Sequence, residues 1–207
     1  HTNEQINGLI ALDLTTGSLN SLQTKCLIIA DGGYEGVWTG TKVGLGLDLA
    51  MKAGLAVRDL EFVAWAPLAV KGTNVVLPIG MLADGATLHH SNGTPLDVEL
   101  TADSTKLSEA IISKGDVVLD ARDMGESSVW WSQTFELVLQ RLGINMKKQT
   151  VSVQPRVATT IGGIATDEHG RAVIGRWSRW FTGLYAAGGS ACSGLHGAGL
   201  IAGNRLL

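Results

Sequence analysis

The sequence has few cysteines, no long apolar run and no cluster of basic residues. Only Cys26 and Cys192 are present among 207 residues, and they do not form a CxxC pair, so their number excludes a structural zinc site. We expect two buried free thiols in a reducing compartment. No apolar stretch reaches the ~18 residues of a membrane helix, and the first residues, HTNEQING, do not resemble a signal peptide. These absences favour a cytoplasmic protein without direct membrane insertion.

The balance of charge makes some partners improbable. The formal net charge is −3, and charged residues make up 17% of the chain. The nearest approach to a basic group is Arg171, Arg176 and Arg179, a spacing more typical of a solvated loop than of a phosphate-binding surface. We therefore expect no nucleic-acid partner.

Glycine is abundant, and two glycine pairs follow apolar runs. The chain has 27 glycines, about twice the usual share of roughly 7%. Gly32 and Gly33 follow the run Cys26 to Ala30, which is typical of a strand buried on both faces of a sheet. Gly188 and Gly189 follow Leu184 to Ala187 and precede small residues that could start a helix. Such turns bring backbone N–H groups close to a ligand, although a tight turn between packed elements explains the glycines equally well.

The remaining patterns predict a mixed α/β chain. The stretches Gly8 to Leu14 and Leu19 to Lys25 favour a hairpin, and a change of pattern near Glu61 indicates a domain boundary. The expected helices are Lys42 to Ala53, Thr105 to Ser113 with Ser104 as N-cap, and Ser128 to Leu142 ended by Gly143. Further strands are expected at Val117 to Leu119 and at Val151 to Val153, the latter stopped by Pro155, and Pro67 is expected to break the strands before Val70.

No strong catalytic or metal-binding motif stands out. His89 and His90 are adjacent, so they point to opposite faces of an extended chain and are more typical of a surface turn than of a metal site. Ser193 and His196 lie close together, but no GxSxG elbow accompanies them. No GxGxxG follows a strand, so the usual opening of a dinucleotide-binding fold is missing.

Six motifs, in the correct order, nonetheless resemble the flavoprotein subunits of succinate dehydrogenase and fumarate reductase, a family that includes L-aspartate oxidase. The resemblance covers nearly the whole chain. The similar segments are Ala30 to Gly33 (family ATGG), Gly44 to Gly54 (TGDG…AG), Asp59 to Pro67 (DxEFVQFHP), Leu119 to Arg122 (LD.R), Thr160 to Ile164 (TMGGI) and Gly183 to Leu207 (GLYAAGE…HGANRLGGNSLL).

This resemblance implies a fold, a domain organisation and a cofactor. The fold would be α/β, with an α+β capping domain at residues 61–158 inserted into a partial, Rossmann-like FAD-binding domain at residues 1–60 and 159–207. The cofactor would be FAD, which this chain alone would bind weakly or not at all. The residues implied to contact it are Gly32, Gly33, Gly188, Gly189, His196, Gly197, Asn204 and Leu206.

The resemblance also implies a chemistry whose side chains this sequence lacks. The family transfers a hydride between the flavin and succinate or fumarate, using arginines and histidines that neutralise the dicarboxylate. At the matching positions stand apolar or small residues, namely Ala66, Leu82, Ala158, Leu200 and, for a glutamate that contacts the FAD ribose, Gly189. No catalytic residue and no metal ligand is therefore assigned, because losing all of these charges should abolish dicarboxylate turnover.

Three interpretations follow from the resemblance. The first is a fragment of an FAD-dependent oxidoreductase that acts on a different, less charged substrate, with an iron–sulfur or other electron-transfer subunit as partner and a location peripheral to a membrane complex. The second is a non-catalytic structural or assembly subunit that keeps the fold. The third is a truncated gene product without function of its own.

Overall fold

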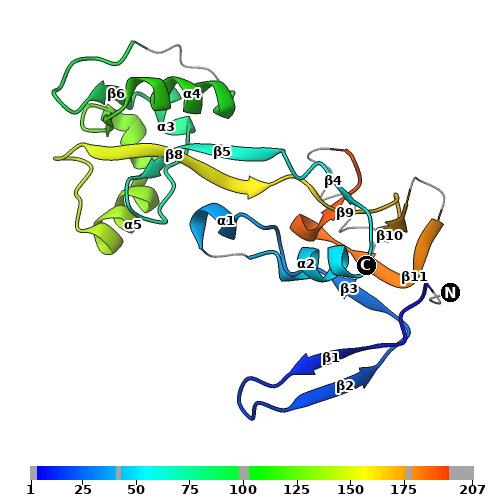
Figure 1. The fold of residues 1–207 in the computed structure, drawn as a ribbon. Helices are drawn as coiled ribbons and strands as arrows, with labels where there is room; N and C mark the ends of the chain where they lie inside the picture. Colours follow the sequence, from blue (N-terminus) through cyan, green and yellow to red (C-terminus); the bar gives the residue numbers. More distant parts are fainter. Residues whose placement is uncertain (1–3, 41–42, 98–102, 176–178, 196–207) are drawn as a thin grey trace. The chain divides into compact units, whose positions relative to one another are not determined.

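The computed structural model describes residues 4–40, 43–97, 103–175 and 179–195. The chain divides into two compact units, shown together in Figure 1. Unit 1 comprises His1–Val63 and Thr159–Leu207, and unit 2 comprises Ala64–Ala158. The mixture of helices and sheets confirms the α/β class.

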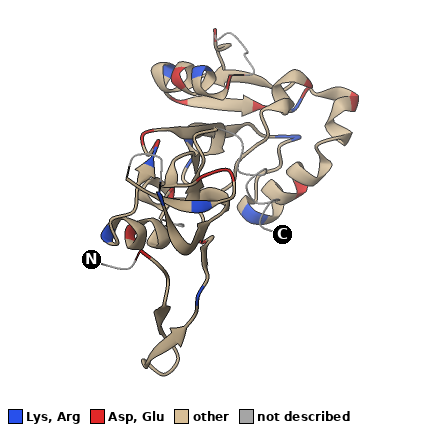
Figure 2. Cartoon of the chain, turned by 90° about the vertical axis from the view of Figure 1, so that its right-hand side faces the viewer, with Lys and Arg blue, Asp and Glu red and all other residues tan. Residues whose placement is uncertain are grey.

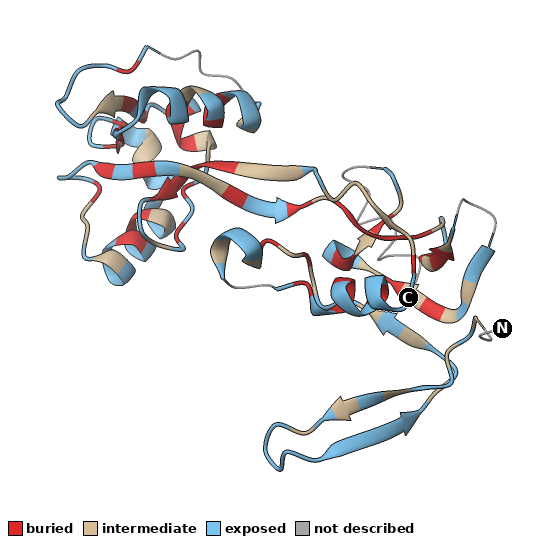
Figure 3. Cartoon of the chain, in the orientation of Figure 1, coloured by how far each residue is buried: buried red, intermediate tan, exposed pale blue. Residues whose placement is uncertain are grey.

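Unit 1 begins with the predicted hairpin. Strands β1 (Gly8–Leu12) and β2 (Leu19–Gln23) pair in antiparallel register, with Gly17 in the left-handed region of the turn at φ 72°. Neither face of the hairpin packs into a core, because every residue of β1 and β2 is exposed or half-buried (Figure 3). The hairpin is therefore held by its backbone ladder rather than by burial of a face.

Two three-stranded sheets form the rest of unit 1. One has the order β10 (Arg171–Ile174), β11 (Arg179–Ala186), β3 (Leu27–Ile29); the other has the order β12 (Ala191–Cys192), β9 (Gly163–Ala165), β4 (Val57–Arg58). Strand β3 pairs in parallel with β11 and is an edge strand, so Ile28 is 49% exposed. The expectation that this strand is buried on both faces is wrong, because Ile28 is exposed while Leu27 and Ile29, which point to the opposite face, are half-buried.

The helices of unit 1 are α1 (Gly36–Thr39) and α2 (Leu45–Lys52). Leu47 and Ala50 of α2 pack into a small core with residues of β9, β10 and β11, whereas Leu49 remains 64% exposed. Gly54 follows α2 with φ 76°, the left-handed conformation that ends a helix and favours glycine.

Unit 2 has a four-stranded sheet with helices packed on it. The strand order is β5 (Val63–Val70), β8 (Val151–Thr160), β7 (Val117–Asp120), β6 (Thr87–His90). The helices are α3 (Gly80–Ala83), α4 (Ser104–Lys114) and α5 (Ser132–Leu142), with the 3-10 helix η1 (Gly125–Val129) before α5. Leu107 of α4, Leu119 of β7 and Val138 of α5 are 0% exposed in one continuous core.

Several local expectations for unit 2 need correction. Strand β5 passes through Pro67, and β8 passes through Pro155. The register of β8 with β7 covers only Val151 to Val153, so the missing N–H of Pro155 interrupts no pairing with β7. His89 and His90 lie on β6 rather than in a surface turn.

The N-cap of α4 is Asp103, not Ser104. Its carboxylate accepts hydrogen bonds from the backbone N–H groups of Thr105 and Lys106 at 3.0 and 3.2 Å. Aspartate and serine are both preferred caps, so the sequence alone left either position open. The end of α5 at Gly143, with φ 70°, is as predicted.

Charges of both signs are spread over the elements of each unit (Figure 2). Within the described ranges, no helix has the length and apolar character needed to cross a membrane. Nor do the described side chains include a group of three or more His, Cys, Asp or Glu that could hold a metal ion.

Candidate cofactor site

The two glycine pairs lie side by side in unit 1. Strands β3 and β11 run in parallel, with Leu27 opposite Leu184 and Ile29 opposite Ala186, so both end at the same edge of the sheet. Gly32 and Gly33 follow β3, and the 3-10 helix η2 (Gly188–Ser190) follows β11. A Cβ atom added to Gly189 would lie 2.9 Å from the backbone nitrogen of Gly33. The carboxyl edge of a parallel sheet is where open α/β folds bind their ligands.

The four glycines are required for different reasons. A Cβ atom at Gly33 would collide with Thr160 Oγ1, and a Cβ atom at Gly189 would be too close to the backbone of the turn at Gly32 and Gly33. Gly33 and Gly189 therefore allow close packing within the protein. Gly32 and Gly188 have φ values of 95° and 63°, which side chains other than glycine rarely adopt. A Cβ at Gly188 would meet nothing within 4 Å. Gly188 and Gly189 are exposed, whereas Gly32 is half-buried and Gly33 is buried, so the accessible backbone of the two turns lies at Gly188 and Gly189.

The buried Ser190 hydroxyl connects the two turns. Its Oγ accepts a hydrogen bond from the backbone N–H of Gly32 at 3.0 Å and lies 2.9 Å from both Asp31 Oδ1 and the Gly32 carbonyl oxygen. Ser190 is 2% exposed. The hydroxyl has one proton to donate, which the Asp31 carboxylate and the Gly32 carbonyl oxygen can each accept, so it holds the second turn against the first.

Asp31 fills the N-terminus of α2. Its Oδ2 accepts a hydrogen bond from the backbone N–H of Gly46 at 2.7 Å, in the first turn of the helix. A Cβ at Gly46 would collide with Asp31 and Ile29, so glycine allows α2 to approach the end of β3. A carboxylate is favourable at the positive end of a helix dipole. The position where an anionic ligand would be bound by α2 is thus taken by the chain's own side chain.

The Thr160 side chain is hydrogen-bonded to the residues that follow the turn at Gly32 and Gly33. Its Oγ1 accepts a hydrogen bond from the backbone N–H of Tyr34 at 3.1 Å and donates to Glu35 Oε2 at 3.3 Å. The Tyr34 hydroxyl donates to the carbonyl oxygen of Leu60 at 2.6 Å. Burial, and then the negative charge of Glu61, raise the pKa of Tyr34 above its usual value. The phenol therefore remains a protonated donor at neutral pH.

Cys192 is a buried thiol next to the site. It is 4% exposed, and its Sγ donates to Asp59 Oδ2 at 3.3 Å. Burial is the main cause that raises the pKa of Cys192, so the thiol stays protonated and is a poor nucleophile. Cys26, by contrast, is exposed, which corrects the expectation that both cysteines are buried; both are free thiols.

The structure places half of the predicted contact residues. Gly32, Gly33, Gly188 and Gly189 come together as described above, whereas four further predicted residues lie outside the described residues: His196, Gly197, Asn204 and Leu206. Sequence reasoning missed the polar groups that support the turns, Asp31, Thr160 and Ser190. Asp31 and Ser190 are the immediate sequence neighbours of the two glycine pairs, which was the available signal; Thr160 is distant from both pairs in the sequence.

The positions that the resemblance matches to the family's charged residues differ in their surroundings. Leu82 of α3 is 8% exposed and belongs to the apolar core of unit 2, and Ala66 of β5 is 6% exposed. Ala158 of β8 is exposed, and Leu200 lies outside the described residues. At Leu82 the surroundings are suited to a hydrocarbon side chain, because an arginine there would need a charged partner or water.

Parallel strands that end in adjacent glycine turns define an α/β protein of the nucleotide-cofactor class. The chain belongs to the family of FAD-binding domains, which matches residues 1–206. The open backbone at Gly188 and the common edge of β3 and β11 fit such a cofactor.

The relatives found by comparison include an L-aspartate oxidase and flavoprotein subunits of fumarate reductase. L-aspartate oxidase of Agrobacterium fabrum is 32% identical over 203 residues, covering 90% of this chain and 38% of that protein. The fumarate reductase flavoprotein subunit of Escherichia coli is 29% identical, covering 97% of this chain and 38% of its own length. The solved E. coli quinol fumarate reductase flavoprotein superposes with a TM-score of 0.82 at 26% identity, covering 99% of this chain and 41% of that one. The chain thus spans less than half the length of these relatives.

Proposed function

We propose that unit 1 supplies the strand ends and glycine turns that face FAD in a flavoprotein oxidoreductase of the succinate dehydrogenase and fumarate reductase type, and that unit 2 is its capping domain. The observation that carries this proposal is the parallel pair β3 and β11, whose glycine turns lie so close at one sheet edge that a Cβ atom added to Gly189 would be 2.9 Å from the backbone nitrogen of Gly33. The flavin, when bound, supplies hydride transfer.

The residues of this chain would act on the cofactor through their backbone. Gly33, Gly188 and Gly189 would present N–H groups, and all four glycines would present a surface without side chains. The N–H of Gly32 is already donated to Ser190, which would keep the two turns together. Because Asp31 occupies the N-terminus of α2, that helix would not bind the diphosphate. We therefore expect this chain alone to bind FAD weakly or not at all.

The substrate proposed for the complete protein is less charged than succinate or fumarate. The apolar surroundings of Leu82 and the small Ala66 support this, because they offer a dicarboxylate no counter-charge at those positions. Since the relatives include proteins named as flavoprotein subunits, we also propose an electron-transfer partner subunit. The cytoplasmic location expected from the sequence stays a prediction.

The test compares two glycine substitutions in the complete gene product. Gly188→Ala adds a Cβ on the open side of the proposed cofactor site, whereas Gly17→Ala adds one in the hairpin turn; both residues have positive φ and nothing within 4 Å of the added atom. Both substitutions should lower the free energy of unfolding by about 1 kcal/mol, because alanine is strained in the left-handed backbone conformation. Only Gly188→Ala should weaken FAD binding, by about tenfold or more, measured by flavin absorbance and calorimetry.

The outcomes separate the proposal from its rival. A purified wild-type protein without flavin absorbance, and without binding of added FAD, would favour the non-catalytic subunit, for which the replaced charges at Ala66 and Leu82 are the supporting observation. Equal FAD affinity in the two variants would mean that the turn at Gly188 does not face the cofactor.

A further inference from the structure

Unit 2 contains a cavity that the proposed cofactor site does not use. Its volume is about 300 Å³, and residues of α4, β7 and β8 and of the segments beside them line it, among them Lys71, Ile112, Asp116 and Pro155. All of these residues belong to unit 2. The volume is at the lower end of the range for small-ligand sites.

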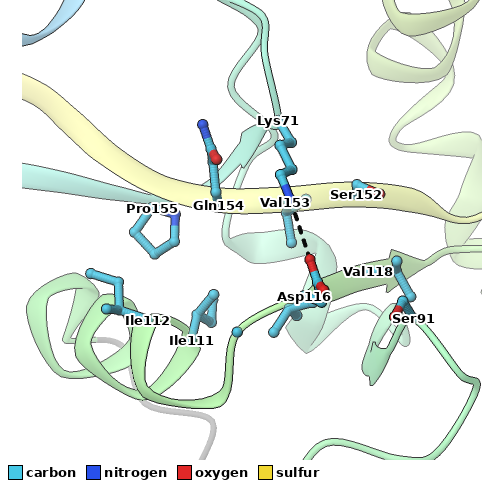
Figure 4. A pocket seen from close by; sticks show the side chains of 12 residues that line it. Lys71, Ser91, Ile111, Ile112, Asp116, Val118, Ser152, Val153, Gln154 and Pro155 are labelled. Atoms are coloured by element: carbon cyan, nitrogen blue, oxygen red, sulfur yellow. Dashed lines mark hydrogen bonds and ion pairs between the residues drawn. The ribbon is translucent and has the colours of Figure 1, made fainter.

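An ion pair crosses the cavity. Lys71 follows β5 and Asp116 precedes β7, and the Lys71 Nζ lies 3.2 Å from Asp116 Oδ1 (Figure 4). The pair joins elements 45 residues apart in the sequence, and its side chains are 56% and 75% exposed. Both charges can therefore exchange their mutual contact for a ligand that carries a charge of each sign, at little cost.

The backbone at Gly115 and Asp116 has an uncommon conformation. Gly115 and Asp116 have φ values of 60° and 28°, and Asp116 is one of two residues other than glycine with positive φ among the described residues. Such a conformation is uncommon and carries strain. It turns the chain sharply after α4 and brings the carboxylate to the mouth of the cavity, beside the negative end of an eleven-residue helix. A ligand ammonium group is favoured at that end.

The other walls of the cavity divide into a polar and an apolar part. Figure 4 shows Ile112 and Pro155 on one side of the ion pair and Ser91 on the other. Ile112 is 57% exposed although it adjoins the buried Ile111. A ligand with an aliphatic body would cover this exposed isoleucine, while hydroxyl groups such as that of Ser152 could donate to its carboxylate.

We propose that this cavity binds a small zwitterion with an aliphatic body, such as a free branched-chain amino acid. Its carboxylate would contact Lys71, its ammonium group Asp116, and its side chain Ile112 and Pro155. A ligand with a single charge would make only one of these two charged contacts. The cavity therefore selects for both charges and for the apolar body together.

The probe is L-leucine, titrated into the full chain and followed by the methyl NMR signals of Ile111 and Ile112. We expect saturable shifts in these signals. N-acetyl-leucine lacks the ammonium group, leucinamide lacks the carboxylate, and glycine lacks the aliphatic body, so each should bind about tenfold more weakly or worse.

Matched variants connect the binding to the ion pair. Asp116→Asn keeps the shape and tolerates a left-handed backbone, and Lys71→Met keeps an unbranched chain, so both should fold and bind L-leucine about tenfold more weakly. Asp48→Asn breaks the exposed Lys52–Asp48 pair of α2, which lines no part of this cavity, and should bind like the wild type. Circular dichroism checks that each variant is folded.

Three results would overturn the proposal. The first is an absence of saturable shifts up to high millimolar L-leucine. The second is leucinamide or N-acetyl-leucine binding as tightly as L-leucine, which would mean that one charge suffices. The third is unchanged affinity in folded Asp116→Asn, which would place the ligand elsewhere. Because none of these readouts involves FAD, they are independent of the proposed function.

Discussion

Unit 2 buries twenty hydrophobic residues in one continuous core, whereas the core cluster of unit 1 has seven, and many large aliphatic side chains of unit 1 are exposed. Leu107 and Leu119 in unit 2 are 0% exposed, while Leu19 and Leu49 in unit 1 are 72% and 64% exposed. The small core of unit 1 is centred on α2, β9 and β11. The contrast teaches that the two units hold their folds by different means, one by side-chain burial and the other to a greater extent by strand pairing and hydrogen-bonded turns.

The largest expected effect comes from removing a buried leucine. Leu119→Ala in β7 should lower the free energy of unfolding by about 2 to 5 kcal/mol, because it removes a fully buried side chain and leaves a cavity. The same substitution at Leu49 in α2 should change it by less than about 0.5 kcal/mol. Urea denaturation followed by peptide-resolved hydrogen exchange measures the free energy of unfolding of each unit separately. Equal losses at the two sites would contradict the contrast between the units.

A smaller effect, similar in both units, is expected from two aspartate–arginine pairs. Asp120 in unit 2 is 9% exposed, and its pKa is lowered chiefly by the side-chain hydrogen bond from Arg122, with 2.6 Å between Asp120 Oδ2 and the guanidinium. For Asp167 in unit 1, burial raises the pKa, but the hydrogen bonds from Arg171 outweigh it and the pKa is lowered as well. Each carboxylate therefore stabilises its unit in the ionised form.

The sign of the pH dependence follows from these lowered values. A folded-state pKa below the unfolded value, about 3.9 for aspartate, gives stability that is present above that value and is lost as the pH falls through the folded pKa. Asp120→Asn should cost about 1 to 2 kcal/mol at pH 7 and much less in strong acid, with Asp167→Asn behaving in the same direction. Unfolding followed between pH 7 and pH 2 measures this, and a cost that is independent of pH would refute it.

The smallest effect tests the glycines that end helices. Gly143 after α5 and Gly54 after α2 have φ values of 70° and 76°, and an added Cβ meets nothing within 4 Å at either. Alanine at either position should cost about 1 kcal/mol, because the cost is that of the left-handed backbone alone. Thermal denaturation of both variants, with Gly17→Ala as a third case, measures it. A much larger loss at Gly143 would mean that packing in unit 2 also contributes there.

Part of the fold was predictable from local patterns. The hairpin, the C-terminal ends of α2 and α5 and strand β7 follow from alternation, helical spacing and the left-handed preference of glycine. The expected start of α5 at Ser128 is wrong, because the 3-10 helix η1 covers Gly125–Val129 and α5 begins at Ser132. The predictions that Pro67 and Pro155 interrupt their strands were wrong, because the cost of proline in a strand depends on whether a neighbouring strand offers an acceptor for the missing N–H. That acceptor belongs to a distant segment.

The candidate site shows the same division. The two glycine pairs were recognised in the sequence as ligand-facing turns, and the resemblance to flavoproteins assigned them a cofactor. Their mutual contact, the Ser190 hydroxyl between them and the carboxylate of Asp31 on α2 required the structure. Hydrogen bonds such as that between Gly32 and Ser190 join residues 158 positions apart, which no local pattern encodes.

The sequence by itself determined the α/β class and the two glycine pairs, and its resemblance to the family predicts that the charged side chains used on dicarboxylates are replaced. Backbone conformation and side-chain chemistry are local properties, so they can be read residue by residue. Only the tertiary structure decided that β3 is an edge strand, that Leu82 belongs to a core and that Lys71 meets Asp116 across a cavity. These depend on which distant segments pack together, and burial and charge pairing have no meaning until that packing is known.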